Sequence, residues 1–290
     1  MKRFSALALT AAAAVAISGC SGSDDPPHGS TSPSAPPTLG KVSLPDDPAA
    51  LADLASKQIR RMTSVKMTAT TKLGKVDGGT ITASLGRSGN APAASLRFEE
   101  APNGTLEVVQ GMMIGNTFYM RDLNDDAAPG KPWLRLSTGD VKDPRLGQTS
   151  KVFQTAVGQI AGAIKQATGE SDMANIRPGK LTADPVDDTI DGTKVRRYAG
   201  TTELAELSGS GQDEQDQQVQ AVLSKNGVKS FPWKLWVDQS GLPRRFSVRM
   251  KIADRGTFSA QTTYSGWGAP VEVKPPPANQ VTGLGNATGE

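Results

Sequence analysis

Cysteine and histidine are almost absent from this sequence of 290 residues, which contains one of each, Cys20 and His28. A metal centre built on Cys or His needs several such ligands, and a disulfide needs two cysteines, so one chain can form neither. Nucleophilic catalysis of the Ser-His-Asp or Cys-His kind would have to use these two residues, which both lie in the first 28 residues, ahead of the expected folded domain. The counts thus argue against metal, redox and covalent enzyme chemistry.

A strong charge of either sign is also lacking. Lys and Arg number 32 against 29 Asp and Glu, a formal net charge of +3, and removal of Lys2 and Arg3 with a signal peptide leaves 30 against 29, or +1. A protein this close to neutral has no general attraction for a phosphate backbone, so we expect no nucleic-acid partner. The sequence has no GxxxxGK[ST] motif, and the short Gly-Leu-Gly run at 283–285 falls in a predicted tail. We therefore expect no cofactor and no enzyme activity, although a paired-carboxylate hydrolase needs no local motif and stays open as an alternative.

One group of carboxylates, Asp184, Asp187, Asp188 and Asp191, is dense enough to raise the question of a calcium site. The group lacks the spacing of an EF-hand loop and its terminal Glu. We interpret it as a solvated turn and expect no metal.

The first 20 residues have the features of a bacterial lipoprotein signal peptide. A short basic start precedes an apolar stretch from Phe4 to Ile17, which is too short to span a bilayer comfortably. The following Ile-Ser-Gly-Cys run at 17–20 matches the lipobox, the pattern at which the peptide is cut and the new N-terminal Cys is acylated. We predict a signal peptide over 1–19 and a lipid, with palmitate-type acyl chains, on Cys20. The alternative is a generic secretory peptide with a chance Cys at its end.

The predicted anchor fixes the expected location. A diglyceride on Cys20 gives the two acyl chains needed for lasting membrane attachment, so we expect an extracytoplasmic protein anchored to the cell membrane. Residues 21–38 contain five prolines and almost no bulky apolar side chain, which is typical of an extended, mobile spacer. We assign 20–44 to the lipidated Cys and spacer, 45–274 to one folded domain that we expect to be monomeric, and 275–290 to a disordered tail.

The folded part opens with an amphipathic helix. Asp47 is a candidate N-cap and Pro48 a candidate first helical residue, and apolar residues then recur on one face until a predicted end near Ser64. From Val65 the apolar period becomes two, which predicts antiparallel strands. Turn signals lie at Gly78-Gly79, Ser88-Gly89-Asn90, Asn103-Gly104 and Gly115-Asn116.

A second, longer helix is predicted over about 149–168 by its broad apolar face. Strands are then expected at 181–184, 194–202, 232–238, 244–252 and 258–267, with an exposed polar loop at 208–218 and a short helix at 217–224. About ten strands with helices between groups of strands predict an α+β fold with a large antiparallel sheet.

Four strand and turn phrases then carry a family resemblance: GNTFY at 115–119, KPWLRL at 131–136, LWVDQSGLPRR at 235–245 and YSGWGAPV at 264–271. With the lipobox, the spacer and the leading helix, they resemble the LppX/LprG-type bacterial envelope lipoproteins, whose folded domain is similar to LolA. The resemblance implies a curved antiparallel half-barrel with helices over its concave face and a cavity that holds acyl chains. It implies no catalytic residues, and the polar run at 208–218 has no recognised counterpart in the family.

The residues themselves make such a cavity plausible, because the inward positions offer small or adaptable Ala and Met side chains and aromatics form only 5% of the chain. The candidate cavity lining consists of Val65, Met67, Ile81, Leu85, Phe98, Val152, Ile160 and Ile164. We therefore expect a tethered lipoprotein that binds the acyl chains of a lipid, glycolipid or lipidated molecule for carriage across the cell envelope. A closed core without a ligand explains the same stripes, and the alternative function is then a tethered sensor or protein-interaction module.

Overall fold

The structure is a computed structural model, which describes residues 38–88, 91–101, 106–123, 127–137, 162, 164, 166–207, 214–252 and 255–283. The predicted signal peptide, Cys20 and His28 lie outside these residues. So does most of the predicted helix at 149–168, of which residues 162, 164, 166 and 167 are described and helical.

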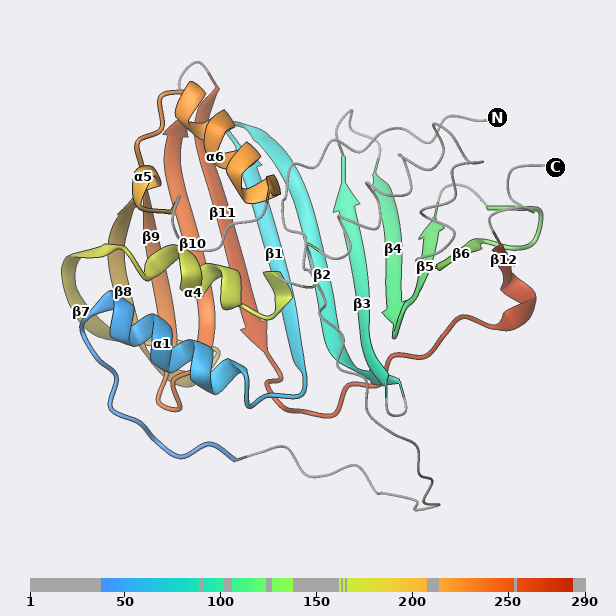
Figure 1. The fold of residues 1–290 in the computed structure, drawn as a ribbon, viewed down its shortest axis with the longest axis horizontal. Helices are drawn as coiled ribbons and strands as arrows, with labels where there is room; N and C mark the ends of the chain where they lie inside the picture. Colours follow the sequence, from blue (N-terminus) through green and yellow to red (C-terminus); the bar gives the residue numbers. More distant parts are fainter. Residues whose placement is uncertain are drawn as a thin grey trace.

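One sheet of twelve strands is the framework of the described part of the chain (Figure 1). Its order from edge to edge is β12-β6-β5-β4-β3-β2-β1-β11-β10-β9-β8-β7. The strands are β1 (Val65–Leu73), β2 (Val76–Ser88), β3 (Ala91–Glu100), β4 (Glu107–Ile114), β5 (Thr117–Asp122), β6 (Trp133–Ser137), β7 (Lys180–Ile190), β8 (Thr193–Glu203), β9 (Ser230–Asp238), β10 (Pro243–Ile252), β11 (Gly256–Ser265) and β12 (Val281–Gly283).

Two antiparallel meanders make up this sheet. β1 to β6 follow one another in space as in sequence, and so do β7 to β11, while the pairing of β1 with β11 joins the two halves at the middle. Only β12, beside β6, is parallel to its neighbour in the described sheet. The predicted α+β class and large antiparallel sheet are confirmed, as an open sheet rather than a closed barrel.

The described helices are α1 (Pro48–Ile59), α4 (Glu170–Ile176), α5 (Leu204–Leu207) and α6 (Glu214–Lys225), with a 3₁₀ turn η2 (Ala278–Gln280). α1 begins as predicted, because the Asp47 carboxylate accepts a hydrogen bond from the Ala50 amide at 2.8 Å and Pro48 follows the cap. It ends at Ile59 rather than near Ser64, because the amides of Arg61 and Met62 bond to carbonyls three residues back and tighten the last turn.

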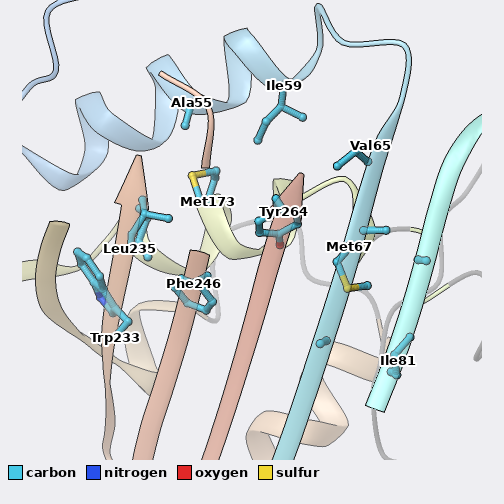
Figure 2. Packing of buried hydrophobic residues seen from close by; sticks show 14 of the residues in the cluster. Ala55, Ile59, Val65, Met67, Ile81, Met173, Trp233, Leu235, Phe246 and Tyr264 are labelled. Atoms are coloured by element: carbon cyan, nitrogen blue, oxygen red, sulfur yellow. The ribbon is translucent and has the colours of Figure 1, made fainter. Parts of the chain in front are cut away.

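α1 and α4 pack on the same face of the sheet, which we call the inner face; the opposite face is the outer face (Figure 1). Figure 2 shows Ala55 and Ile59 of α1 and Met173 of α4 above the apolar side chains of β1, β9, β10 and β11. Leu51, Leu235 and Met67 are at most 1% exposed. This half of the inner face is a closed core.

One predicted turn is wrong. Gly78 and Gly79 lie inside β2, and the chain reverses earlier, at Gly74, which has φ of +62°. Gly79 has φ of +106°, and the register of β1 against β2 shifts between Thr71 and Lys72. The glycine pair therefore permits an irregularity within a strand, a use of glycine that sequence alone does not distinguish from a turn. The tight Gly115-Asn116 hairpin between β4 and β5 is confirmed.

The predicted domain limits also shift at both ends. The Val42 amide bonds to the Gln239 carbonyl, so the end of the predicted spacer already contacts the sheet. Residues assigned to a disordered tail form η2 and β12, and β12 pairs with β6 through Val281, Thr282 and Gly283. The helix predicted at 217–224 begins earlier, at Glu214.

Gly200 gives a test of the closed core. It lies directly opposite Trp233 on the inner face, and a Cβ there would meet the Trp233 ring and lie 2.7 Å from the Lys180 carbonyl oxygen. We expect Gly200→Ala to destabilise the fold by about 1–3 kcal/mol through overpacking, measured as the free energy of unfolding in urea. Gly283→Ala, where a Cβ meets nothing within 4 Å, is the control; equal stabilities of the two variants would contradict the packing seen here.

Candidate functional site

The predicted lining residues that the structure describes come together on the inner face. In the register of the sheet Val65 faces Leu85, and Ile81 faces Phe98, with Met67 next in line on β1. Residues directly opposite each other in antiparallel strands point to the same side. Alternation in the sequence therefore identified one common surface on β1, β2 and β3.

The other three predicted lining residues are treated separately. Val152 and Ile160 lie outside the described residues. Ile164 is described, half-buried, and packs against the core cluster.

The inner surface continues onto strands that the prediction left out. Phe98 faces Val109 on β4, and Leu96 faces Gly111, which in turn faces Met120 on β5. A third row passes through Ala94, Met113 and Phe118. The signal was present in the sequence, because apolar residues alternate with others along β4 and β5, but single Gly and Met residues are weak markers of a binding surface.

The inner face of β2 to β5 contains buried residues, such as Leu96 and Phe118, together with several half-buried apolar ones. Beneath α1 and α4 the side chains are closed off from solvent, as Leu235 at 0% exposure shows. Five apolar inner-face residues of β2 to β5 are only half-buried, namely Leu85, Phe98, Val109, Met113 and Met120. Partly exposed apolar side chains that lie close together offer a surface to an apolar partner.

The composition of this tract suits an irregular apolar ligand. It combines small residues, such as Ala83, Ala94 and Gly111, with Met113 and Met120, whose unbranched side chains adapt their shape. We refer to Leu85, Phe98, Val109, Met113 and Met120, with the small residues between them, as the inner tract.

Carboxylates border the inner tract at one end. Glu100 of β3 lies directly opposite Glu107 of β4 on the inner face. Burial, and then repulsion by the Glu107 carboxylate, raise the pKa of Glu100 above its ordinary value. This end of the tract is therefore polar and acidic, and the rest is apolar.

A buried acid of α4 lies in the closed half. Asp172 is 6% exposed and accepts a hydrogen bond of 2.6 Å from the Tyr264 hydroxyl of β11. Burial raises the pKa of Asp172 to about 7, and the hydrogen bond from Tyr264 only partly opposes that rise. The same hydroxyl lies 3.3 Å from the carbonyl of Gln166. The Tyr264 hydroxyl of β11 thus contacts both α4 and the segment before it.

The aspartate group predicted to be a solvated turn is different in the structure. Asp184, Asp187 and Asp188 belong to β7, and only Asp191 lies in the turn, with φ of +47°. The Asp188 carboxylate accepts hydrogen bonds from the Trp236 indole at 2.9 Å and from the Thr189 amide, and both lower its pKa. Three of the four aspartates therefore belong to an edge strand, and one of them, Asp188, accepts a hydrogen bond from a tryptophan.

Two further searches concern only the described part of the chain. There, no three Asp, Glu, His or Cys side chains gather closely enough to hold a metal ion. Its helices are too short or too polar for any of them to cross a bilayer.

Comparison with known proteins gives structural similarity at low identity. No protein-family model and no curated protein matches the chain. The crystal structure of LprF from Mycobacterium bovis is 15% identical, with a TM-score of 0.46, over 79% of this chain and 96% of LprF. That of the lipoprotein LppX from Mycobacterium tuberculosis is 18% identical, with a TM-score of 0.43, over 78% of this chain and 98% of LppX. Similarity at this level assigns neither a family nor a ligand to this chain.

Asp172 predicts a pH dependence of stability. Its pKa is raised from 3.8 to about 7 on folding, so the folded state holds its proton more tightly than the unfolded state. The corresponding stabilisation, on the order of 4 kcal/mol for a shift of this size, is complete below about pH 4 and is lost as the pH rises to about 7. Asp172→Asn keeps an acceptor for Tyr264 without a charge, so we expect it to be more stable than the original chain at pH 8.

The measurement is urea unfolding at pH 5 and pH 8. The difference in unfolding free energy between the two pH values should shrink in Asp172→Asn and remain in the control Asp187→Asn, an exposed residue of β7. An unchanged pH dependence in Asp172→Asn would show that other groups cause it.

Proposed function

We propose that this chain is a membrane-tethered extracytoplasmic lipoprotein whose inner tract binds the acyl chains of a lipid or lipidated molecule. The observation that carries the proposal is the continuous apolar surface on the inner face of β2 to β5, in which five residues are only half-buried and lie among buried ones. Acyl chains are flexible and apolar, and each methylene removed from water contributes about 0.8 kcal/mol. Little headgroup selectivity is expected from such a surface.

The sheet gives the tract a suitable length. Rows of inner-face residues run across neighbouring strands, and one row passes from Leu85 through Ala94, Met113 and Phe118 to Leu136 of β6, with Leu85 and Met113 half-buried. Strands in a sheet lie about 4.8 Å apart, so five strands span about 19 Å. That span is comparable to an extended acyl chain of about 15 carbons.

Tethering rests on the sequence. The lipobox ends at Cys20, the only cysteine of the chain, and a diacylated cysteine is sufficient for lasting attachment. A carrier that stays on the membrane while its apolar tract takes up acyl chains is suited to carriage across the envelope. Enzyme activity forms no part of this proposal.

A second function has support from the closed half of the molecule. Leu51, Leu235 and Val237 are fully buried and the core beneath α1 and α4 is filled (Figure 2). Such packing also suits a tethered sensor or protein-interaction module that holds no lipid. The two functions differ in whether the purified protein retains an extractable lipid.

The first test is native mass spectrometry of the protein lacking the acylated Cys20, purified from its own host and then extracted with organic solvent. We expect a bound diacyl or triacyl species that leaves on extraction. An empty protein that also takes up no fluorescent fatty acid would favour the interaction module.

Two neighbouring methionines give a matched mutational test. Met113 and Met112 are adjacent on β4 and both half-buried, but Met113 points to the inner face and Met112 to the outer face. We expect Met113→Glu to weaken fluorescent fatty-acid binding by at least tenfold, because a carboxylate in the tract must lose its water to admit a methylene chain. Met112→Glu should leave the affinity within twofold.

Circular dichroism and the thermal midpoint show whether both variants fold. Equal affinities of two folded variants would remove the inner tract as the binding surface.

Cys20→Ser tests the tether separately. Without the thiol no lipid can be attached, so we expect the protein to move from the membrane fraction to the soluble fraction of host cells. Fractionation with immunodetection measures the change. A variant that stays with the membrane would mean that the chain is held by another element.

A further inference from the structure

The outer face carries a groove that the proposed lipid-binding tract does not use. It has a volume of about 580 Å³ and lies across β7 to β11 and β1, in the half of the sheet that holds the closed core on its other side. A groove on this face cannot be continuous with the inner tract, because the sheet itself separates them.

The floor of the groove is main chain. Gly200, Trp233, Val248 and Ala260 lie opposite one another in register on four consecutive strands, and their side chains belong to the inner face. The outer side of this row therefore presents backbone, which lets a ligand lie close to the sheet.

Two rows of outer-face side chains border that floor. One row runs through Ala199, Lys234, Ser247, Gln261 and Thr70. On the other side of the floor, Arg249, Ser259 and Lys72 lie opposite one another. Ala199, Ser247 and Ser259 have short side chains, which leave space in the groove. The cations that border it, Lys72, Lys234 and Arg249, have long ones.

The charges of the groove have one sign. Among the described residues, its lining contains Lys72, Lys234 and Arg249 and no carboxylate. The Lys72 ammonium lies 2.9 Å from Asp77, whereas no described carboxylate lies within ion-pair distance of Lys234 or Arg249. Two cations diagonally opposite each other on neighbouring strands, with no described acid as a partner, form a local positive potential on a nearly neutral protein.

The neighbouring outer row adds two more cations. Arg197 and Arg245 lie on either side of Trp236 in register, and the Arg245 guanidinium carbon is 5.5 Å from the Trp236 ring centre. The Asp188 carboxylate accepts a hydrogen bond from the Trp236 indole and lies near both arginines, which together lower its pKa, so it offsets part of their charge. Two cations beside one acid leave this side of the groove positive by about one charge.

The uncharged lining defines what else the ligand must offer. Hydroxyls of Thr70, Thr182, Ser247 and Ser259 and the amide of Gln261 surround the cations. Hydroxyl and amide groups both donate and accept hydrogen bonds, so they can pair with the hydroxyl groups of a polyol. Ammonium and guanidinium groups bind phosphate.

We propose that the outer groove binds the phosphate ester of a polyol, with the phosphate between Lys234 and Arg249 and the polyol hydroxyls along the Ser and Thr side chains. This site is independent of the acyl-binding function, since it lies on the other face. The ester is either a free molecule or the exposed headgroup of an anionic lipid, and both offer the same chemistry.

Isothermal titration of the full chain in neutral detergent with sn-glycerol 3-phosphate tests the proposal, with glycerol and sulfate as reference ligands. We expect the ester to bind at least tenfold more tightly than either reference. Lys234→Gln with Arg249→Gln should reduce that affinity at least tenfold, and added salt should weaken it. The matched control, Lys131→Gln with Lys194→Gln, removes the same charge at exposed residues outside the groove and should change the affinity less than twofold.

A competition experiment identifies the source of the ester. Vesicles of phosphatidylglycerol that displace the bound ester, where phosphatidylcholine vesicles do not, indicate a lipid headgroup; failure of both to compete indicates a free ester. Binding no tighter than that of sulfate, or an equal loss in both double variants, would overturn the proposal.

Fatty-acid uptake separates this proposal from the lipid-binding one. Lys234→Gln with Arg249→Gln should leave fatty-acid uptake unchanged, and Met113→Glu should leave ester binding unchanged. Each proposal can therefore be contradicted without affecting the other.

Discussion

The pairing of β1 with β11 is the contact on which the rest of the sheet depends. It runs from Lys66 opposite Ser265 to Leu73 opposite Phe258 and is the junction of the two meanders. Because side chains alternate along a strand, this register also determines which residues of both halves share a face. Met67 faces Tyr264 across the junction, so the core beneath α1 and α4 continues without a break from one meander to the other. A shift of one residue would reverse the faces of one half relative to the other.

This common register produces two surfaces of different chemistry. Inner positions combine a closed core with an apolar tract, whereas many outer positions of the same strands are Lys, Arg, Ser or Thr. Met112 and Met113 show how local the distinction is, since a single step along β4 changes the surface. The two proposed sites therefore arise from one sheet but use different residues of it.

Much of the fold follows from the sequence. The N-cap Asp47, the strand beginning at Val65 and the shared face of Ile81 and Phe98 are local or period-two signals, which sequence preserves directly. The twelfth strand was missed because Val281–Gly283 has only three residues and its pairing with β6 is a contact between distant segments. The turn predicted at Gly78-Gly79 was wrong because glycine occurs both in turns and in irregular strands. The outer groove could not be predicted, since Lys234 and Arg249 come together only through the register of β9 and β10.

Under the proposed membrane attachment, the two edges of the sheet have a consequence for copies that lie close together on one surface. A long exposed strand edge is a template for pairing with another chain. β7, at one edge, contains Pro185 and three aspartates, and its register with β8 shifts twice. The opposite edge ends in β12, which has only three residues. Proline, charge, irregular register and short length all discourage edge-to-edge addition, so many copies held side by side can remain separate rather than join into extended sheets.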